Sequence, residues 1–373
     1  MRILVTIPCL MTGGTEIQTL NLVRALVEGG HEVVTACYFE HTDYMVEQYE
    51  KAGSRVVLFS QEGKRVGGLA GIRFLAKHLW RMKRSFKPDA VHVQYMAPGA
   101  IPIILLWLMG QKNILATAHT NADIYSPKQL RLVQFIQKHI TRVFTCITKT
   151  AEKAFFGSAF NYAEHKGETL PCHAHYTIYN SLPSYIQITD KVREPKDVMT
   201  IGVVSRLETI KGMDLVIPAV EKVYRKHKNI KLLIVGDGTL RETMERSLTS
   251  NLSPLISFAG RQGQDTLQSY YDQIDILLMP SRSEGFGLTA IEGMARGCVV
   301  VASNTGGLPE VVIDGKVGLL HQPESIDDLA DKISCLLENS ALFEEMKRNL
   351  TGHVSQFTFE KYSTSFNKLY SSL

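Results

Sequence analysis

The segment Pro280-Ser-Arg-Ser-Glu-Gly-Phe-Gly-Leu-Thr-Ala-Ile-Glu292 follows the short apolar run Ile276–Met279 and opens a stretch of helical character. A short apolar run bounded by turn residues is typical of a buried strand. Gly285 and Gly287 allow a sharp turn and a close approach of the backbone to a ligand, so we expect a helix to begin near Leu288. The segment therefore predicts a strand-to-helix turn of a parallel α/β sheet.

The same alternation of short apolar runs and helical stretches extends in both directions, as in parallel sheets covered by helices on both faces. It is interrupted near residues 183–197, where Pro183, Pro195 and a charged stretch break the apolar pattern. We therefore expect two α/β units joined by a linker. The expected strands are Ile3–Ile7, His31–Tyr38, Arg55–Phe59, Ala90–Gln94, Ile114–Ala118 and Arg142–Ile147, then Met199–Val204, Lys231–Val235, Ile256–Ala259, Ile276–Met279, Val299–Ala302 and Gly318–Leu320. Two helical stretches, Ser325–Glu338 and Phe359–Tyr370, are expected to close the chain, separated by a polar, Gly-containing segment.

The composition, with 45% hydrophobic and 21% charged residues among 373, is that of a soluble globular protein. This length exceeds what one hydrophobic core usually supports, which again favours two domains. The longest apolar stretch, Ile101–Met109, is far shorter than the roughly 20 residues of a membrane-spanning helix. The N-terminus lacks the long apolar core of a secretory signal. Six cysteines without a CxxC pair argue against a disulfide framework or a zinc knuckle, so we expect a reducing cytoplasm.

Two carboxylates of the opening segment, Glu284 and Glu292, are separated by seven residues. Glu284 would lie in the turn and Glu292 about one helical turn further on, so both could face one cleft. The free amides near Leu288 and Thr289 would form an anion site at the helix N-terminus. One acid could then hold sugar hydroxyls and the other ribose hydroxyls, with a diphosphate between them. An ordinary turn with a capping glutamate explains the same residues about as well.

A second motif, residues 203–212, places Arg206 and Lys211 just after the first expected strand of the second half. The carboxyl ends of parallel strands border the ligand crevice of such sheets, and two cations there could clamp a diphosphate. Two solvated surface charges are an equally good interpretation of this motif taken alone.

A glycine pair, Gly13-Gly14, follows the first expected strand and precedes the expected helix Thr15–Glu28, which Gly29-Gly30 would end. The pair invites phosphate binding, but it is not a G-x-G-x-x-G motif and no acid clearly ends the next strand. The dinucleotide fingerprint therefore fails. A tight turn with Thr15 as the helix cap is the alternative.

Taken in order, these motifs, with Val235-Gly-Asp-Gly238 and Asn304-Thr-Gly-Gly-Leu-Pro-Glu310, resemble those of the family 4 retaining glycosyltransferases. The resemblance covers the whole chain and is most specific over residues 199–320. It implies the GT-B fold, in which two Rossmann-like, doubly wound domains face each other across a cleft. Residues 1–185 would form the acceptor domain, with 358–373 packed back on it, and residues 186–357 the domain for a nucleotide-sugar donor. It also implies that no catalytic metal or cofactor is needed.

The resemblance assigns roles residue by residue. Arg206 and Lys211 would neutralise the donor diphosphate, Glu284 would lie beside the donor sugar, and Glu292 would bind ribose. His119, after the strand Ile114–Ala118, would also lie beside the sugar, although a lone histidine there is more often structural. The implied catalytic set is His119, Glu284, Arg206 and Lys211. The implied donor-binding set is Gly13, Gly14, Arg206, Lys211, Gly238, Arg261, Gln262, Glu284, Gly285, Phe286, Gly287, Leu288, Thr289 and Glu292, with Glu310 as a helix-start acid beside the site.

The implied reaction moves a hexose with retention, by front-face attack in which the departing phosphate helps to deprotonate the acceptor hydroxyl. The expected donor is a UDP-sugar, and the expected acceptor is a glycan or a lipid-linked molecule of surface polysaccharide or lipopolysaccharide synthesis, with no nucleic acid. A nucleotide-sugar 2-epimerase of the same fold and a non-catalytic module in a glycan-assembly complex are the alternatives. An oxidoreductase ranks last because the fingerprint is missing.

Two local features depart from these expectations. Family members often have Asn-Gly-Val-Asp after the last strand of the first domain, where this chain has Asn180-Ser-Leu-Pro183, so the turn geometry there is open. The loop Cys172-His-Ala-His175 contains residue types that bind metals, but without a second cluster it does not predict a zinc site.

Residues 64–87 contain eight basic residues and no acid, interleaved with aromatic and aliphatic residues. They lie in the more positive half of the chain, since residues 1–180 hold 20 Lys and Arg against 13 Asp and Glu. A basic amphipathic helix of this kind predicts peripheral contact with anionic lipid at the inner face of the plasma membrane. The solvated outer face of a Rossmann helix is the equal alternative.

Overall fold

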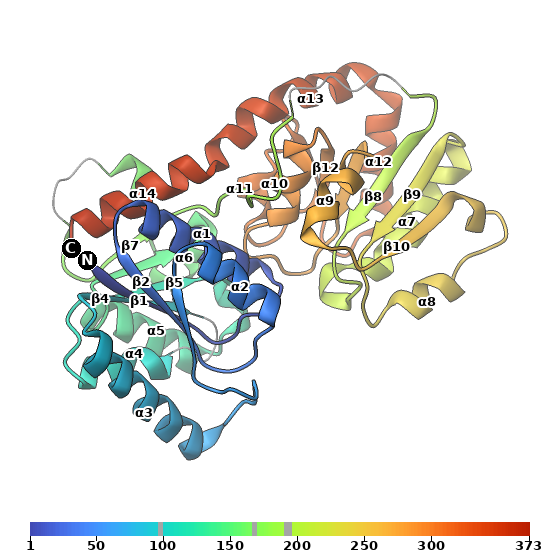
Figure 1. Cartoon of the computed structure of the whole chain (residues 1–373). Coiled ribbons are helices and arrows are strands. Elements are labelled where there is room, and N and C mark those ends of the chain that lie inside the picture. The colour runs from blue at the N-terminus through green and yellow to red at the C-terminus, as the bar shows by residue number, and fades with distance from the viewer. Residues whose placement is uncertain (96–99, 166–169, 190–195) are drawn as a thin grey trace. The chain divides into compact units, whose positions relative to one another are not determined.

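The computed structural model describes residues 1–95, 100–165, 170–189 and 196–373 (Figure 1). The chain divides into two compact units. One comprises Met1–Ser181 with Phe359–Leu373, and the other comprises Leu182–Thr358. Each unit is built on a parallel sheet covered by helices, which confirms the predicted α/β class of Rossmann-like domains. Residues 190–195 of the expected linker, including Pro195, lie outside the described residues.

The sheet of the first unit has seven parallel strands in the order β3-β2-β1-β4-β5-β6-β7. Six of them match the expected strands to within two residues at either end. The seventh, β7, was not expected from the sequence because its four residues include a histidine and carry no apolar pattern. The strands are β1 (Arg2–Ile7), β2 (Glu32–Cys37), β3 (Arg55–Leu58), β4 (Ala90–Tyr95), β5 (Ile114–Ala118), β6 (Val143–Cys146) and β7 (Ala174–Thr177).

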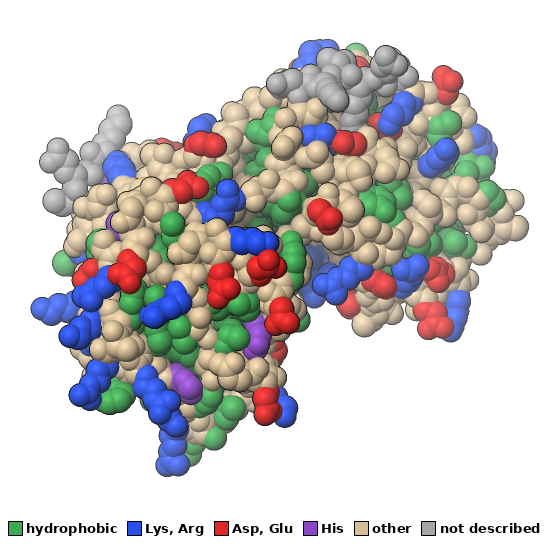
Figure 2. Space-filling view, viewed as in Figure 1, with side chains coloured by type: hydrophobic (Ala, Val, Ile, Leu, Met, Phe, Trp, Pro, Cys, Tyr) green, Lys and Arg blue, Asp and Glu red, His purple; other side chains and the backbone are tan. Residues whose placement is uncertain are grey.

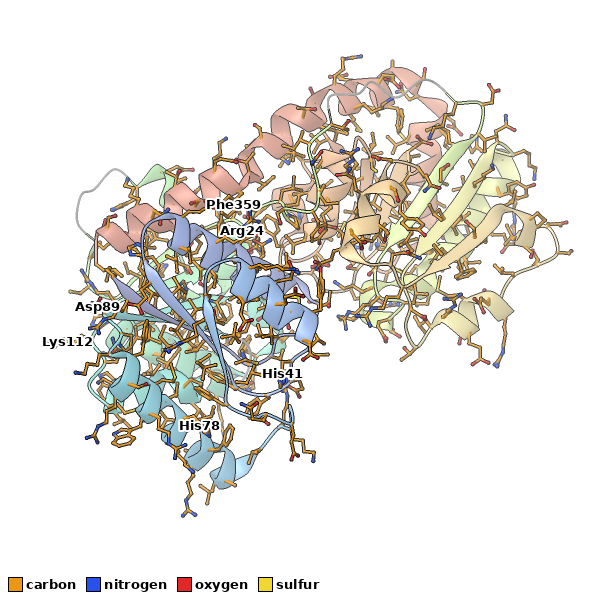
Figure 3. All side chains as sticks on the ribbon, viewed as in Figure 1. Arg24, His41, His78, Asp89, Lys112 and Phe359 are labelled. Atoms are coloured by element: carbon orange, nitrogen blue, oxygen red, sulfur yellow. The ribbon has the colours of Figure 1, made fainter. Side chains whose placement is uncertain are left out.

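Helices cover both faces of this sheet (Figure 1). The C-terminal helix packs on the first helix of the chain, where the Arg24 guanidinium lies over the Phe359 ring at 5.0 Å (Figure 3). The helices are α1 (Gly14–Glu28), α2 (Asp43–Lys51), α3 (Gly68–Phe86), α4 (Ala100–Leu108), α5 (Pro127–His139), α6 (Lys149–Phe156) and α14 (Phe359–Ser371), with 3₁₀ turns at Ala122–Ile124 and Tyr162–Glu164.

The sheet of the second unit has six parallel strands in the order β10-β9-β8-β11-β12-β13, close to the expected boundaries. The helix α7 packs on α12, and α10 packs on α13. The strands are β8 (Met199–Val204), β9 (Ile230–Val235), β10 (Ile256–Gly260), β11 (Ile276–Met279), β12 (Val299–Ser303) and β13 (Gly318–His321). The helices are α7 (Met213–Lys226), α8 (Arg241–Arg246), α9 (Gln264–Tyr271), α10 (Leu288–Ala295), α11 (Leu308–Val311), α12 (Ile326–Glu338) and α13 (Ser340–Val354), with 3₁₀ turns at Thr209–Lys211, Ser253–Leu255 and Ser355–Phe357.

Two sequence-based expectations about helices were wrong. The polar segment expected after Glu338 is the helix α13, because Phe343, Met346 and Leu350 recur at helical spacing and are buried. Thr15 does not cap α1. The N-cap is Gly13, and no side chain caps that end of the helix.

The order in which successive strands are added across the sheet reverses at one point in each sheet. In the first unit this point lies between β1 and β4, and in the second between β8 and β11. Loops at the carboxyl ends of such strand pairs form the usual ligand crevice of doubly wound sheets. Among the described helices, none is both long enough and apolar enough to cross a bilayer.

Candidate functional site

The predicted donor-binding residues of the second unit all follow strands of its sheet at their carboxyl ends. The loops after β8 and β11 flank the switch point and carry the charged residues of the two central motifs. This edge is where a doubly wound sheet binds ligands. Arg206 and Lys211 follow β8, Gly238 follows β9, Arg261 and Gln262 follow β10, Glu284 to Thr289 follow β11, and Glu310 lies in α11 after β12.

The structure brings together one residue from each of the two central loops. Lys211 Nζ lies 2.7 Å from Glu284 Oε2, across 73 positions of sequence. The two side chains are 21% and 16% exposed, so the pair is partly shielded yet open to a ligand. A phosphate would be attracted by the ammonium, and sugar hydroxyls can donate to the carboxylate.

The loop that carries Lys211 is fastened to the loop that carries Glu284 by Arg282. Its guanidinium binds the Asp214 carboxylate with two hydrogen bonds of 2.7 and 2.8 Å, and its amide donates to the Ile210 carbonyl at 2.9 Å. The hydrogen bonds from Arg282 lower the pKa of Asp214. Arg282 stands inside the opening motif, but sequence reasoning assigned it no role because its partner is 68 positions away.

A glycine in the left-handed region begins the helix α10. Gly287 has φ 101° and is the N-cap, and a Cβ there would lie 2.8 Å from the Leu308 side chain. The amides of Ala290 and Ile291 bond to the Gly287 carbonyl. Those of Leu288 and Thr289 precede the first intrahelical donors and carry the positive end of the helix dipole. The helix start predicted near Leu288 is therefore confirmed.

The neighbouring residues of this motif are held by packing and by the next loop. The Phe286 ring is buried and meets the Phe357 ring in a T-shaped contact. The Glu284 carbonyl accepts the Gly307 amide at 3.1 Å, so the loop after β12 braces the turn. Gly285 lies between them and is only partly buried.

The second carboxylate of the motif has a different environment. Glu292 is only 5% exposed, and its two oxygens accept hydrogen bonds from the hydroxyls of Tyr185 at 2.9 Å and Tyr271 at 2.6 Å. Burial raises the pKa of its carboxyl group. Glu292 is therefore more completely shielded from solvent than Glu284, and its contact with ribose stays a prediction.

The other residues expected near the nucleotide vary in how open they are. Arg206 and Arg261 have exposed side chains. The Gln262 amide donates to the Ala259 carbonyl at 2.6 Å. Gly238 packs so tightly that a Cβ would lie 2.5 Å from the Leu207 carbonyl oxygen, which is a structural reason for glycine there. Their contact with a base also stays a prediction.

In the first unit, His119 follows β5 and is 9% exposed. Its Nε2 lies 2.7 Å from Gln94 Oε1 on β4, and because this oxygen only accepts, Nε2 carries the hydrogen. Burial lowers the pKa of His119 to about 4, so the imidazole is neutral at pH 7. Sequence reasoning missed Gln94, whose Nε2 is buried without a hydrogen-bond partner among the described residues.

The glycine pair of the first unit lies beside an acid of its own helix. Glu16 folds back so closely that a Cβ on Gly13 would lie 2.5 Å from its carboxylate. The Cys9 thiol donates to Glu16 at 3.1 Å, and burial raises the pKa of this carboxyl. A carboxylate is therefore already present at the N-terminus of α1, and a phosphate contact of the Gly14 amide stays a prediction.

Two further motifs have local structural roles. At the turn Asn180–Pro183, the Gln18 side chain bonds to both the amide and the carbonyl of Ser181, which fixes the turn against α1. In the loop at 172–175, the His175 ring is paired with the buried Glu152 at 2.6 Å. The described residues contain no group of three metal-ligating side chains.

Comparison with known proteins gives two family matches. The profile described as Glycosyltransferase Family 4 matches residues 12–158, and the one described as Glycosyl transferases group 1 matches residues 185–352. Together the two matches span most of the chain.

Curated relatives carry glycosyltransferase names. An uncharacterised glycosyltransferase of Methanocaldococcus jannaschii is 35% identical over 163 residues, which is 44% of this chain and 45% of that protein. D-inositol 3-phosphate glycosyltransferase of Corynebacterium kroppenstedtii is 27% identical over 307 residues, which is 75% of this chain and 66% of that protein. The chain thus matches about half to two thirds of the length of these relatives.

Solved structures agree in fold. The crystal structure of Anabaena HepE in complex with UDP matches with a TM-score of 0.80 at 18% identity, over 100% of both chains. At this level of identity the match shows the fold.

Proposed function

Because the chain belongs to the family 4 glycosyltransferases, with the GT-B type of fold, we propose that it is a retaining hexosyltransferase that uses a nucleotide-diphosphate sugar. The Lys211–Glu284 ion pair is the observation that carries this proposal. It puts a cation suited to phosphate in contact with an acid suited to sugar hydroxyls. Both stand at the switch point of the sheet, beside the positive end of α10.

The proposed chemistry needs no side chain as nucleophile. The bond between the anomeric carbon and the diphosphate oxygen breaks, and the acceptor hydroxyl oxygen bonds to the same face of that carbon. The acceptor proton passes to the departing phosphate. Lys211, Arg206 and the amides of Leu288 and Thr289 stabilise the negative charge that grows on the leaving group. Glu284 positions the sugar. Lys211 and Arg206 supply the positive charge that a metal ion supplies in other transferases.

A uridine nucleotide is the proposed donor carrier. The support is the Anabaena HepE structure, which holds UDP on the same fold. Backbone near Gly238, Arg261 and Gln262 would hold the base, and Glu292 the ribose after its tyrosine partners move or share its oxygens. The remaining lone pairs of the Glu292 oxygens allow such sharing.

The proposed acceptor is a hydroxyl of a glycan or of a lipid-linked molecule in surface polysaccharide synthesis, such as that of lipopolysaccharide. A peripheral contact of residues 64–87 with an anionic membrane at the inner face of the plasma membrane belongs to this proposal. The support is that most of these residues lie in the amphipathic helix α3, whose buried side carries Leu75, Leu79 and Met82 and whose outer side carries exposed cations.

The test is turnover of UDP-hexoses with and without glycan acceptors, preceded by a screen for thermal stabilisation by UDP and GDP. We expect stabilisation by UDP, together with release of UDP that depends on acceptor and yields an α-linked product from an α-linked donor. Epimerised donor formed without acceptor would identify an epimerase. Absence of both binding and turnover across donors would favour a non-catalytic module and end the proposal.

A further inference from the structure

The outer side of α3 carries one continuous stripe of exposed residues. Their spacing of four, four, three and four residues places them on the same side of the helix. Leu69 is 75% exposed and Trp80 is 50% exposed. The three cations of the stripe are exposed as well. The Arg84 guanidinium lies 5.2 Å from the Trp80 ring centroid. The stripe consists of Leu69, Arg73, Lys77, Trp80 and Arg84.

The neighbouring helix α4 ends in exposed apolar residues that the basic segment 64–87 does not include. Trp107 is 46% exposed and Leu108 is 69% exposed. The helices α3 and α4 pack together, and Lys83 Nζ donates to the Met109 carbonyl directly after α4. This bond ties the C-terminal part of α3, which also carries Trp80 and Arg84, to the exposed end of α4.

The charge of this region is almost entirely positive. Residues 64–112 contain nine Lys and Arg and a single acid, Asp89, and the first two cations, Lys64 and Arg65, are paired with Glu62 and Glu40. The Asp89 carboxylate accepts the Arg2 amide at 2.7 Å, which ties it to the start of β1. Lysine and arginine side chains gather over α3 in Figure 2, and Figure 3 shows Asp89 and Lys112 near the start of the sheet.

Both tryptophans of the chain, Trp80 and Trp107, lie in this region, each about half exposed. Half-exposed tryptophan flanked by arginine and lysine is the composition of surfaces that enter the headgroup layer of a membrane. A second copy of this chain would set cations against cations, and a nucleic acid offers nothing to the exposed leucines. An anionic lipid surface satisfies both kinds of side chain.

We propose that α3 and the C-terminal end of α4 form one membrane-binding face, in which Trp80, Trp107 and Leu108 enter the headgroup layer of an anionic bilayer. The cations of the stripe bind lipid phosphates around them. This inference extends the membrane contact proposed for residues 64–87 and rests on it. The new element is α4, which supplies a second apolar anchor.

Intrinsic fluorescence tests the proposal directly, because this face contains every tryptophan of the chain. The variants Trp80→Phe and Trp107→Phe each leave one reporter. With vesicles that contain phosphatidylglycerol and brominated phosphatidylcholine, we expect quenching and a shift to shorter wavelength from both single reporters. Quenching of Trp80 alone would overturn the role of α4 and leave the contact of residues 64–87 standing. Vesicle binding without quenching of either tryptophan would overturn the whole face.

Charge reversal tests the electrostatic half. The variant Arg73→Glu/Lys77→Glu/Arg84→Glu should lose flotation with anionic vesicles several-fold, whereas Lys226→Glu/Lys228→Glu on the second unit should float like the wild type. The proposal would be overturned if all three proteins were recovered equally with anionic vesicles. It would also be overturned if the wild type were recovered equally with neutral and with anionic vesicles. Turnover of a soluble acceptor, measured without vesicles, should be equal in all three proteins. If the wild type does not turn over this acceptor, that result counts against the proposed transferase activity and not against the membrane-binding face.

Discussion

The two units have the same kind of sheet, yet the described side chains that follow their strands differ in charge and exposure. In the second unit, Lys211, Glu284 and Arg282 form ion pairs that a ligand can reach. In the first unit, Glu16 after β1 and His119 after β5 are buried, and residues 96–99 after β4 lie outside the described residues. His119 is neutral at pH 7, and the carboxyl of Glu16 has a raised pKa.

This difference shows that two sheets of the same fold can carry different chemical groups at the carboxyl ends of their strands. A diphosphate needs accessible cations, which the second unit supplies. Neutral hydrogen-bonding groups suit sugar hydroxyls, which carry no charge. Exposed cations of the first unit lie instead on the outer face of α3, which joins β3 to β4.

The largest expected effect comes from removing the cation of the second unit. Lys211→Ala should lower kcat/KM about 10²- to 10³-fold, because the leaving diphosphate loses a charge that stabilises it. Donor turnover assays with purified protein measure this. Lys226→Ala, an exposed lysine on α7, is the matched control and should be unchanged.

A double-variant cycle then sharpens the comparison. Because Lys211 and Glu284 are in contact, the combined loss in Lys211→Ala/Glu284→Ala should be smaller than the product of the two single losses. Losses that simply multiply would show that the two residues act independently and would weaken the assignment of one shared site.

In the first unit, adding a charge should lower activity, whereas in the second unit removing a charge should lower it. Gln94→Glu would put a carboxylate beside His119 and raise the pKa of the histidine from its value of about 4. We expect a loss of activity of about tenfold at pH 6 that is partly restored at pH 8, because the neutral imidazole returns. Gln94→Asn is the uncharged control. A flat ratio of variant to wild-type activity across this range would exclude a role for the neutral form.

The buried histidine also predicts a pH dependence of stability. The unfolded chain binds a proton on His119 below about pH 6.5, whereas the folded chain does so only near pH 4. This contribution to stability is complete above pH 6.5 and is lost as the pH falls. Between pH 4 and pH 6.5, the unfolding free energy of the wild type should therefore rise with pH. Its slope should exceed that of His119→Asn by about 1.4 kcal/mol per pH unit. The exposed His139→Asn control should follow the wild type, and a parallel curve for His119→Asn would contradict the buried, neutral assignment.

The smallest expected effect comes from removing Arg282, which links the loops that carry Lys211 and Glu284. Arg282→Ala should cost about 1 kcal/mol or less in unfolding free energy, since Asp214 is 41% exposed and the ion pair is screened. Denaturant titration measures it, with Arg225→Ala, at an exposed helix pair, as the control. Donor turnover should fall only a few-fold, and a loss as large as that of Lys211→Ala would make Arg282 a ligand of the donor.

The sequence by itself determined the alternation of strands and helices, because the period of apolar residues is a local property. It also placed Glu284, Lys211 and His119 directly after strands. It missed β7 and α13, where a histidine-containing edge strand and a Gly352-containing helix blur the period.

Only the tertiary structure decided which of these groups meet and which are neutral. The Lys211–Glu284 contact and the burial of Glu292 under Tyr185 join residues 73 and 107 positions apart. The approach of α3 to the end of α4, like the low pKa of His119, depends on how helices and strands pack. Sequence spacing specifies which side of one element a residue occupies, whereas the partner it meets depends on the packing of the whole unit.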